Sequence, residues 1–500
     1  MVILDKLKGV KNKWPNKTVF IEDTCFSTKT ITFIEFYEDA FKLAKYFKKQ
    51  GIKKGTNVSI FIPMSIDLYK TLTALWIIGA TPVFFDYSAN EEYVNKCLNI
   101  INPEIVISKG IISWYAKTKK CFSKMRKINI NKCKETLLKE DYEYEKGLEN
   151  DGAIVTFTSG STGIPKVVVR THQFLIDQHT VIEKNLNYKP SQIDLGILPI
   201  FTLANIATGI TTVIPHSQLK DMSKINAKNI TKQILKYKIN SMTVSPSVLQ
   251  QITAYADNKN IKLDTLETLH IGGGPVFPNQ LKIINEMKLK AFIVYGSSEA
   301  EPISILSWKE MLNSKEKIKN GAGLPVGRII PEISLKIINN DIAFPQKEKI
   351  EPFEESTIGE IIVSGINVLQ GYFNGVGDED NKININGTIW HKTGDCGYLD
   401  DNNMLWLVGR KNNFVKIEDE IIYPFTLQAL LDTQYDIHKS AYFSHNDKCY
   451  LVLEEKKEIQ QNILERYKIN EILYIEKIPM DKRHNSKVDI PELKRILNFN

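Results

Sequence analysis

A loop rich in glycine and hydroxyl side chains follows an apolar, strand-like segment, and this pair of features limits what the chain can fold into. The apolar segment covers residues 153–157, and the loop covers residues 158–166. Glycine lets backbone N–H groups turn inward, hydroxyl groups add donors, and lysine supplies a compact positive charge. Such a loop at the end of a strand suits the β- and γ-phosphates of a nucleotide. The residues suited to these contacts are Thr158, Ser159, Gly160, Ser161, Thr162, Gly163 and Lys166.

The spacing within this loop excludes a Walker A motif. That motif requires a glycine, four residues, Gly-Lys and then serine or threonine. Here two residues separate Gly160 from Gly163, Lys166 lies three positions further on, and Val167 follows it. A flexible polar turn is the alternative interpretation of the loop taken alone.

The chain has the length and composition of a globular protein with more than one domain. Its 500 residues exceed what one hydrophobic core usually serves, and 43% of them are hydrophobic and 25% charged. The net charge of +7 comes from scattered lysines, so we expect no nucleic acid partner. A slightly basic surface favours anionic small molecules such as ATP or coenzyme A.

The sequence shows no signal peptide, no cysteine cluster with metal-binding spacing and no membrane-spanning stretch. Its six cysteines form no CxxC pair, and we expect them to be reduced. The N-terminus does not resemble a signal peptide. The longest apolar stretch, residues 71–85, is interrupted by Gly79 and Pro82 and predicts a buried helix followed by a strand. We therefore expect a cytoplasmic protein without an integral membrane segment.

The order of strand-like and helix-like patterns predicts an α/β fold. Apolar residues at helical spacing predict a helix over residues 31–50, and similar helices alternate with strands to about residue 300. Short alternating runs over residues 306–373 predict a β-barrel-like subdomain. We predict a large N-terminal domain of stacked α/β subdomains over residues 1–409, a hinge at 410–413, and a small mobile α+β domain over 414–500.

Two further motifs follow the loop in the middle of the chain. Residues 272–275 read Gly-Gly-Gly-Pro after the strand-like residues 268–271, and residues 294–299 contain Tyr295 and Glu299. The face of a tyrosine can stack on a base, and a carboxylate is a hard oxygen ligand suited to Mg²⁺. Taken singly, these residues are more typical of a turn, a core aromatic and a charge at a helix N-terminus.

Two more motifs lie toward the C-terminus. Asp395 ends the run Trp-His-Lys-Thr-Gly-Asp, and Arg410 follows fifteen residues later. Lys487 lies in the polar stretch of residues 479–489. By itself an aspartate in a turn is usually a turn former, and an exposed lysine is usually only solvated.

The five motifs in this order resemble those of the adenylate-forming (AMP-binding) enzyme superfamily, which includes acyl-CoA synthetases and peptide-synthetase adenylation domains. The resemblance covers residues 157–489, most of the chain. It implies that ATP and Mg²⁺ are used to convert a small-molecule carboxylic acid into an acyl-adenylate, with pyrophosphate as the leaving group. In the family the acyl group then passes to the thiol of coenzyme A or of a carrier-protein phosphopantetheine, after the C-terminal domain rotates.

The resemblance also implies a role for each matching residue. The loop would hold the β- and γ-phosphates, the glycine-rich segment would lie along the adenine, and Asp395 would accept the ribose hydroxyls. Lys487, Ser298 and Glu299 would be the catalytic residues: the first two face the α-phosphate, and Glu299 binds the metal. The residues assigned to ATP besides the loop are Gly273, Gly274, Pro275, Tyr295, Gly296, Asp395 and Arg410.

This chain departs from the family's common pattern near the acyl acceptor. Asp419 stands where a glycine near the pantetheine path is usual, and Ser486 replaces the glycine before Lys487. Pro479 lies eight residues before Lys487, against six in the common motif. This form resembles a branch of fatty-acid and β-hydroxy-acid activating enzymes, which includes β-lactone synthetases that need no thiol.

The sequence predicts the acid only by class. Residues 198–209 contain no acidic side chain that could pair with an α-amine, so we do not expect an α-amino acid. A hydrophobic pocket would suit a fatty or other apolar acid. Its candidate residues, which ordinary core packing explains equally well, are Phe201, Leu203, Ile206, Val276 and Ile303.

Three hypotheses follow from the sequence. The first is an acid–thiol ligase that forms an acyl-adenylate and transfers the acyl group to coenzyme A or an acyl carrier protein. The second keeps the adenylate but closes a β-hydroxy acid into a β-lactone. The third is a nucleotide-binding protein that has lost turnover and acts by interaction, an idea prompted by Asp419 and Ser486.

Overall fold

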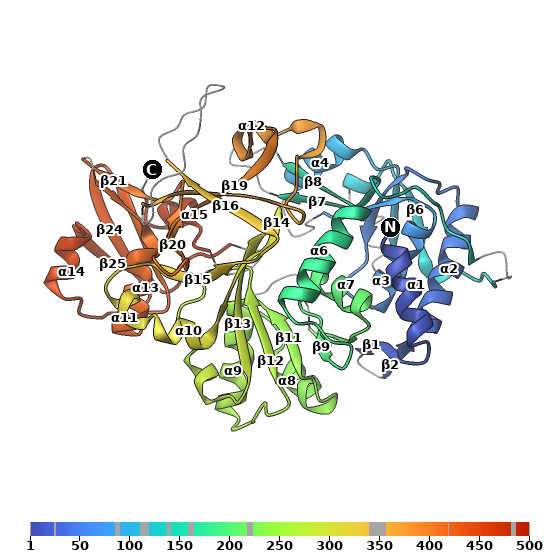
Figure 1. Cartoon of the computed structure of the whole chain (residues 1–500), viewed down its shortest axis with the longest axis horizontal. Coiled ribbons are helices and arrows are strands. Elements are labelled where there is room, and N and C mark those ends of the chain that lie inside the picture. Colours follow the sequence, from blue (N-terminus) through green and yellow to red (C-terminus); the bar gives the residue numbers. More distant parts are fainter. Residues whose placement is uncertain are drawn as a thin grey trace. The chain divides into compact units, whose positions relative to one another are not determined.

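The structure is a computed structural model of the chain, and it falls into two compact units (Figure 1). The first unit is Met1–His216 with Leu369–Asp380, and the second is Ser217–Val368 with Asn381–Asn500. The structure describes residues 2–24, 27–85, 91–110, 120–137, 142–158, 165–217, 224–339, 357–418, 420–481 and 487–499.

The first unit contains a six-stranded sheet that carries the ends of the glycine-rich loop. Its strand order is β6-β5-β3-β4-β7-β8, and all neighbours are parallel except the last pair. The antiparallel pair β7–β8 brings Thr158 opposite Lys166. The strands are β3 (Asn57–Phe61), β4 (Thr81–Val83), β5 (Ile105–Ser108), β6 (Arg126–Asn129), β7 (Gly152–Thr158) and β8 (Lys166–Thr171).

A second set of strands in this unit has the order β9-β10-β1-β2. Strand β10 pairs with β9 and β1 in parallel, and β2 is antiparallel to β1. The strands are β1 (Thr18–Asp23), β2 (Thr28–Thr32), β9 (Ile193–Leu195) and β10 (Thr211–Ile214). The helices of the unit are α1 (Ile3–Lys13), α2 (Phe33–Lys49), α3 (Ile66–Ile77), α4 (Glu91–Ile101), α6 (His172–Asn185) and α7 (Pro199–Thr208).

Helix α2 confirms the helix predicted over residues 31–50. Thr32 and Glu35 form a capping box, in which the side chain of each accepts a hydrogen bond from the backbone N–H of the other. The helix ends before Gly51, whose φ of +74° suits a residue without a Cβ atom. Helix α3 and β4 likewise match the predicted buried helix and strand. Within the described residues, no helix is long and apolar enough to cross a membrane.

The second unit is built on a sheet that changes from parallel to antiparallel along its width. Its order is β16-β17-β19-β20-β15-β14-β13-β12-β11, with β18 beside β19. Strands β11, β12 and β13 are parallel, and every pair from β13–β14 onward is antiparallel. This change near residue 300 agrees with the predicted passage from α/β layers to a β-rich region. The strands are β11 (Ser241–Val244), β12 (Thr268–Gly272), β13 (Lys290–Ser297), β14 (Ala300–Ser307), β15 (Leu324–Ile329), β16 (Ile333–Ile338), β17 (Gly359–Gly365), β18 (Lys382–Ile385), β19 (Thr388–Leu399) and β20 (Leu405–Arg410).

The C-terminal part of the second unit has small sheets and hydrophobic clusters of its own. Strands β21 (Val415–Ile417) and β22 (Glu420–Ile422) form a hairpin, and β23 (Ser440–His445), β24 (Lys448–Leu453) and β25 (Glu471–Tyr474) form a three-stranded sheet. The helices of the unit are α8 (Ala227–Lys236), α9 (Pro246–Asn258), α10 (Trp308–Asn313), α11 (Lys315–Lys319), α13 (Pro424–Tyr435), α14 (Gln461–Arg466) and α15 (Ile490–Ile496); the short α12 (Asp378–Asn381) spans the boundary between the units. The mixed content agrees with the predicted α+β region, while the hinge at 410–413 stays a prediction.

Asp432 on α13 ties this C-terminal part to the rest of the second unit. Its buried carboxylate accepts a hydrogen bond from the backbone N–H of Asn279 at 2.7 Å and contacts the ring of His438 at 2.8 Å. The side-chain amide of Asn279 donates back to the Asp432 carbonyl at 2.9 Å. Asn279 lies four residues after the predicted adenine segment.

Candidate functional site

In the second unit, the Asp395 side chain is contacted by two side chains from other strands, those of Arg410 and Tyr295. Asp395 on β19 lies opposite Arg410 on β20, and the guanidinium donates to its Oδ1 at 2.7 Å. The hydroxyl of Tyr295 on β13 donates to its Oδ2 at 2.9 Å. The Asp395 side chain is 13% exposed and that of Arg410 is 38% exposed. The carboxylate is therefore fixed in orientation by a donor on each oxygen.

The charges around this carboxylate are coupled. The negative charge of Asp395 raises the pKa of Arg410 above its ordinary value, and the charge of Glu299 acts in the same direction. Burial, with Asp395 beside it, raises the pKa of Tyr295 well above its ordinary value, so its hydroxyl stays a neutral donor. Glu299 thus belongs to the same electrostatic cluster as Asp395 and Arg410.

Ser298 and Glu299 form the tip of a tight hairpin between β13 and β14. Ser297 pairs with Ala300 across the strands, which leaves only these two residues in the turn. The backbone N–H of Glu299 donates to the Ser297 hydroxyl at 3.2 Å. A Cβ atom on Gly296 would approach the Ala300 carbonyl oxygen to 2.7 Å, so this position requires glycine.

The glycine-rich segment leaves the sheet beside Tyr295. Strand β12 runs parallel to β13, with Gly272 opposite Val294, so both strands end at the same edge. A Cβ atom on Gly272 would meet the Val294 carbonyl oxygen at 2.7 Å, and Gly273 has a φ of +82°. Gly273, Gly274 and Pro275 therefore begin at the carboxyl edge of parallel strands, where ligands bind in α/β sheets.

This edge fits a nucleotide with a metal ion that arrives on its phosphates. A fixed carboxylate can accept ribose hydroxyls, and the glycines allow a base close to the backbone. Mg²⁺ usually takes one or two carboxylates and fills its other positions with phosphate oxygens and water. Glu299, at the tip of the β13–β14 hairpin, carries one such carboxylate.

The ends of the predicted phosphate loop lie in the first unit. Thr158 and Lys166 close the β7–β8 hairpin, whereas a Walker A loop leads into a helix. The Lys166 ammonium lies 5.6 Å from the centre of the Tyr372 ring. The middle of the loop, Ser159, Gly160, Ser161, Thr162 and Gly163, lies outside the described residues.

Lys487 lies at the base of a loop in the C-terminal part. Its backbone N–H donates to the Asp481 carboxylate, and the Asp481 N–H donates to its carbonyl, both at 2.7 Å. Met480 and Val488, the neighbours of these two residues in the chain, form an isolated antiparallel β-bridge. The lysine side chain is exposed. These bonds hold Asp481 and Lys487 together; residues 482–486, which lie between them, and Asp419 lie outside the described residues.

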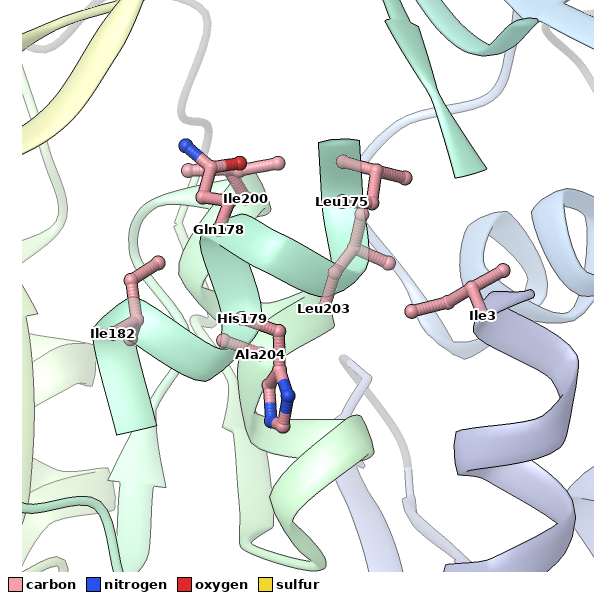
Figure 2. A pocket seen from close by; sticks show the side chains of 8 residues that line it. All are labelled: Ile3, Leu175, Gln178, His179, Ile182, Ile200, Leu203 and Ala204. Carbon is pink, nitrogen blue, oxygen red and sulfur yellow. The ribbon is translucent and has the colours of Figure 1, made fainter. Parts of the chain in front are cut away.

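The residues predicted for an acyl pocket are mostly buried core. Phe201 and Ile206 on α7 are buried, Ile206 belongs to the main hydrophobic core of the first unit, and Leu203 packs against that core. Val276 and Ile303, in the second unit, are also buried. Figure 2 shows a cavity lined by Leu203, with Ile3 of α1 on one side and His179 of α6 below. Its volume is about 20 Å³, enough for roughly one water molecule and not for an acyl chain.

Two residues that contact predicted site residues were not themselves predicted: Thr393 in the second unit and Tyr372 in the first. Thr393 accepts a hydrogen bond from the Asp395 N–H at 3.1 Å and donates to the Ile361 carbonyl at 2.9 Å, which helps to fix this part of β19 beside the carboxylate. Tyr372 contacts Lys166 although more than 200 residues separate them. Thr393 stands in the Thr-Gly-Asp run and could have been found there; no local pattern points to Tyr372.

The chain is similar in sequence to proteins that activate acids. A sequence model of the AMP-binding enzyme family matches residues 7–373. An olefin β-lactone synthetase from Xanthomonas campestris pv. campestris is 22% identical over 82% of this chain and 77% of its own. A 2-succinylbenzoate–CoA ligase from Geobacillus sp. is 24% identical over 92% of this chain and 93% of its own.

The fold is similar to that of solved adenylate-forming enzymes. The o-succinylbenzoate CoA synthetase of Bacillus subtilis, in complex with its acyl-adenylate intermediate, has a TM-score of 0.77 at 20% identity, covering 98% of this chain and 97% of that one. The amide bond synthetase McbA of Marinactinospora thermotolerans has a TM-score of 0.81 at 14% identity, covering 99% of both chains. These similarities confirm the predicted fold class.

Proposed function

The chain belongs to the family of AMP-binding enzymes and is an AMP-forming ligase, and we propose that it uses ATP to convert a hydrophobic carboxylic acid into an acyl-adenylate. The observation that carries this proposal is the Asp395 carboxylate, held by Tyr295 and Arg410 at the edge where the glycine-rich segment leaves the sheet. A carboxylate fixed in this way is preorganised for the two hydroxyls of a ribose.

The reaction joins two anions, so positioning and charge neutralisation are its main requirements. An oxygen of the acid attacks the α-phosphorus of ATP, a new P–O bond forms, and the bond to the β-phosphate breaks as pyrophosphate leaves. In the proposed arrangement Lys487 and Ser298 face the α-phosphate, and the loop that ends at Lys166 holds the leaving phosphates. Mg²⁺, when bound by Glu299 and the phosphates, would neutralise charge that develops on the leaving group.

We propose that the acyl group then passes to a thiol, on coenzyme A or on a carrier phosphopantetheine. The sulfur attacks the acyl carbon, the thioester bond forms, and AMP leaves. The similarity to a CoA ligase over more than nine-tenths of both chains supports this acceptor. The proposed hinge at Asn412 follows the end of β20 and would allow the C-terminal part to move between the two steps.

A second candidate function is β-lactone formation, in which the β-hydroxyl of the activated acid attacks its own acyl carbon and AMP leaves. The acidic sequence Glu418, Asp419 and Glu420 supports it. Glu418 directly follows β21 and Glu420 begins β22, and carboxylates here would repel the phosphates of coenzyme A. Lys468 pairs with Glu420 at 2.7 Å and offsets part of this charge. The similarity to olefin β-lactone synthetases favours the same candidate.

The acid is proposed to be fatty or otherwise hydrophobic rather than an α-amino acid. Helix α7 begins at Pro199 and, up to its end at Thr208, contains no acidic side chain for an amine. Since the cavity beside Leu203 is too small for an acyl chain, the chain of the acid would have to enter elsewhere.

One experiment tests these proposals together. Pyrophosphate release is measured with panels of fatty, β-hydroxy, aromatic and amino acids, each with and without coenzyme A, and products are identified by mass. We expect release with a hydrophobic acid and an acyl-CoA product when coenzyme A is present. A dehydrated product without coenzyme A would instead establish lactone formation. Release with amino acids alone would contradict the substrate class, and no release with any acid, despite ATP binding, would favour the non-catalytic hypothesis.

A further inference from the structure

The turn at residues 371–377 of the first unit receives the side chain of Lys166. The Lys166 ammonium lies over the Tyr372 ring at 5.6 Å from its centre, within the range of a cation–π interaction. Tyr372 is only 5% exposed and packs against Val168 and Leu369. The ring is therefore held by the core and cannot follow the lysine if the lysine moves.

Gly377 leaves room for the stem of the same lysine. A Cβ atom at this position would lie 3.2 Å from both Cγ and Cδ of Lys166 and 3.4 Å from Cε. Gly377 also has a φ of +93°, a conformation that favours glycine. The aliphatic part of Lys166 thus runs along the backbone of Gly377, and its charged end reaches the ring.

The turn is fixed by bonds that do not involve Lys166. The backbone N–H of Tyr372 donates to the Asp378 carboxylate at 2.8 Å, and the N–H of Gly375 donates to the Tyr372 carbonyl at 3.0 Å. The Tyr372 ring and the Gly377 backbone, which both lie beside the lysine, therefore belong to one preformed turn.

We propose that Tyr372 and Gly377 form a cradle that positions Lys166 for the phosphates of ATP. This inference rests on the proposed function, because it takes Lys166 to be a phosphate contact. A free lysine stem loses much rotational freedom when it binds an anion, and a stem that already lies in a groove loses less. An aromatic ring suits this task better than a carboxylate would, because it attracts the ammonium without neutralising its charge.

The test is a double-mutant cycle on the full chain, with the affinity for MgATP measured by calorimetry in the absence of any acid. We expect Tyr372→Leu to weaken MgATP binding about fivefold, the loss of a single cation–π contact. Lys166→Ala should weaken it at least as much, and adding Tyr372→Leu to Lys166→Ala should change nothing further. Tyr372→Phe keeps the ring and should recover the affinity.

Two further variants separate positioning from folding. Phe373→Leu removes the neighbouring ring, which packs on a different cluster, and should leave MgATP affinity unchanged. Gly377→Ala strains the turn at its φ of +93° with or without Lys166, and it also crowds the lysine stem. The loss of MgATP affinity should therefore be larger when Lys166 is present than in the Lys166→Ala background, and this difference measures the cradle. The Gly377 comparison keeps the test valid even if Tyr372→Leu fails to fold.

The outcomes distinguish this inference from the proposed function. If Lys166→Ala leaves MgATP affinity unchanged, the phosphate role of Lys166 is wrong, and the cradle falls with it. If Lys166→Ala weakens MgATP binding, but Tyr372→Leu and Gly377→Ala lower the MgATP affinity by the same factor with and without Lys166, only the cradle is wrong. Normal coupling together with no pyrophosphate release for any acid would support the cradle and contradict the proposed reaction.

Discussion

Replacing Asp395 by asparagine tests the proposed nucleoside site most directly, because the change preserves shape and removes only charge and one acceptor. The Tyr295 hydrogen bond to Oδ2, at 2.9 Å, contributes about 1 kcal/mol. The Arg410 bond to Oδ1, at 2.7 Å, is charge-assisted, but the arginine is 38% exposed, so solvent reduces its contribution to about 1 kcal/mol. The asparagine oxygen can still accept from Arg410, and the tyrosine hydroxyl can rotate to accept from the amide. We therefore expect Asp395→Asn to lower the free energy of unfolding by about 1–2 kcal/mol.

The effect on ATP should exceed the effect on folding. A ribose that binds a carboxylate makes charge-assisted hydrogen bonds, and loss of the charge and one acceptor should cost about 2 kcal/mol, or roughly a 30-fold weaker affinity. Urea unfolding, followed by tryptophan fluorescence, measures the change in the free energy of unfolding. Calorimetric titration with MgATP measures the change in ATP affinity.

Tyr295→Phe is the matched control for this experiment. It removes the hydroxyl that bonds Oδ2 but keeps the ring, so we expect a loss of about 1 kcal/mol in stability and only a small change in ATP affinity. If Asp395→Asn destabilises the protein yet binds ATP like the wild type, Asp395 is a structural residue and the proposed nucleoside site is wrong. Equal loss of ATP affinity in both variants would also contradict the reasoning.

Two further predictions concern the proposed catalytic lysine, Lys487, and the dependence of stability on pH. Lys487→Ala should slow adenylation a hundred- to thousand-fold, about 3 kcal/mol, in a pyrophosphate-exchange assay. Replacing the exposed Lys456 by alanine is the control and should have no effect. Exchange at the wild-type rate in Lys487→Ala would refute the assignment. Burial lowers the pKa of His172 and of His179 to about 4, against an ordinary value near 6.5. The unfolded chain therefore binds more protons between these values, so stability should fall as pH drops from about 6.5 to 4, by up to roughly 3 kcal/mol for each histidine. Urea unfolding at pH 7 and pH 5 checks this, and His179→Gln should lose part of the pH dependence; an unchanged profile would show that His179 does not contribute.

Local patterns were enough to predict several elements of the fold. The apolar spacing of residues 31–50 predicted α2, because a helix places every third or fourth side chain on one face. Gly79, with a φ of +69°, lies between α3 and β4, whereas Pro82 lies within β4. The residues of the acyl pocket could not be assigned, because an apolar side chain looks the same in sequence whether it lines a ligand or the core. Ile206 proved to be core.

The motifs were also readable from the sequence, because each consists of residues close together in the chain. The contacts that these motif residues make in the folded protein could not be read from the sequence. The bond between Tyr295 and Asp395 spans 100 residues, and it depends on the order and register of strands β13, β19 and β20. No local pattern encodes that register.

The sequence by itself determined the family and the residue types of an adenylating site, since glycine, hydroxyl, carboxylate and lysine groups must stand at set positions along the chain for this chemistry. Only the tertiary structure decided how the carboxylate of Asp395 is held, that Ser298 and Glu299 occupy the tip of a two-residue turn, and that Tyr372 receives Lys166. The physical reason is that hydrogen bonds and cation–π contacts act over a few ångströms in space, and folding alone determines which distant residues come that close.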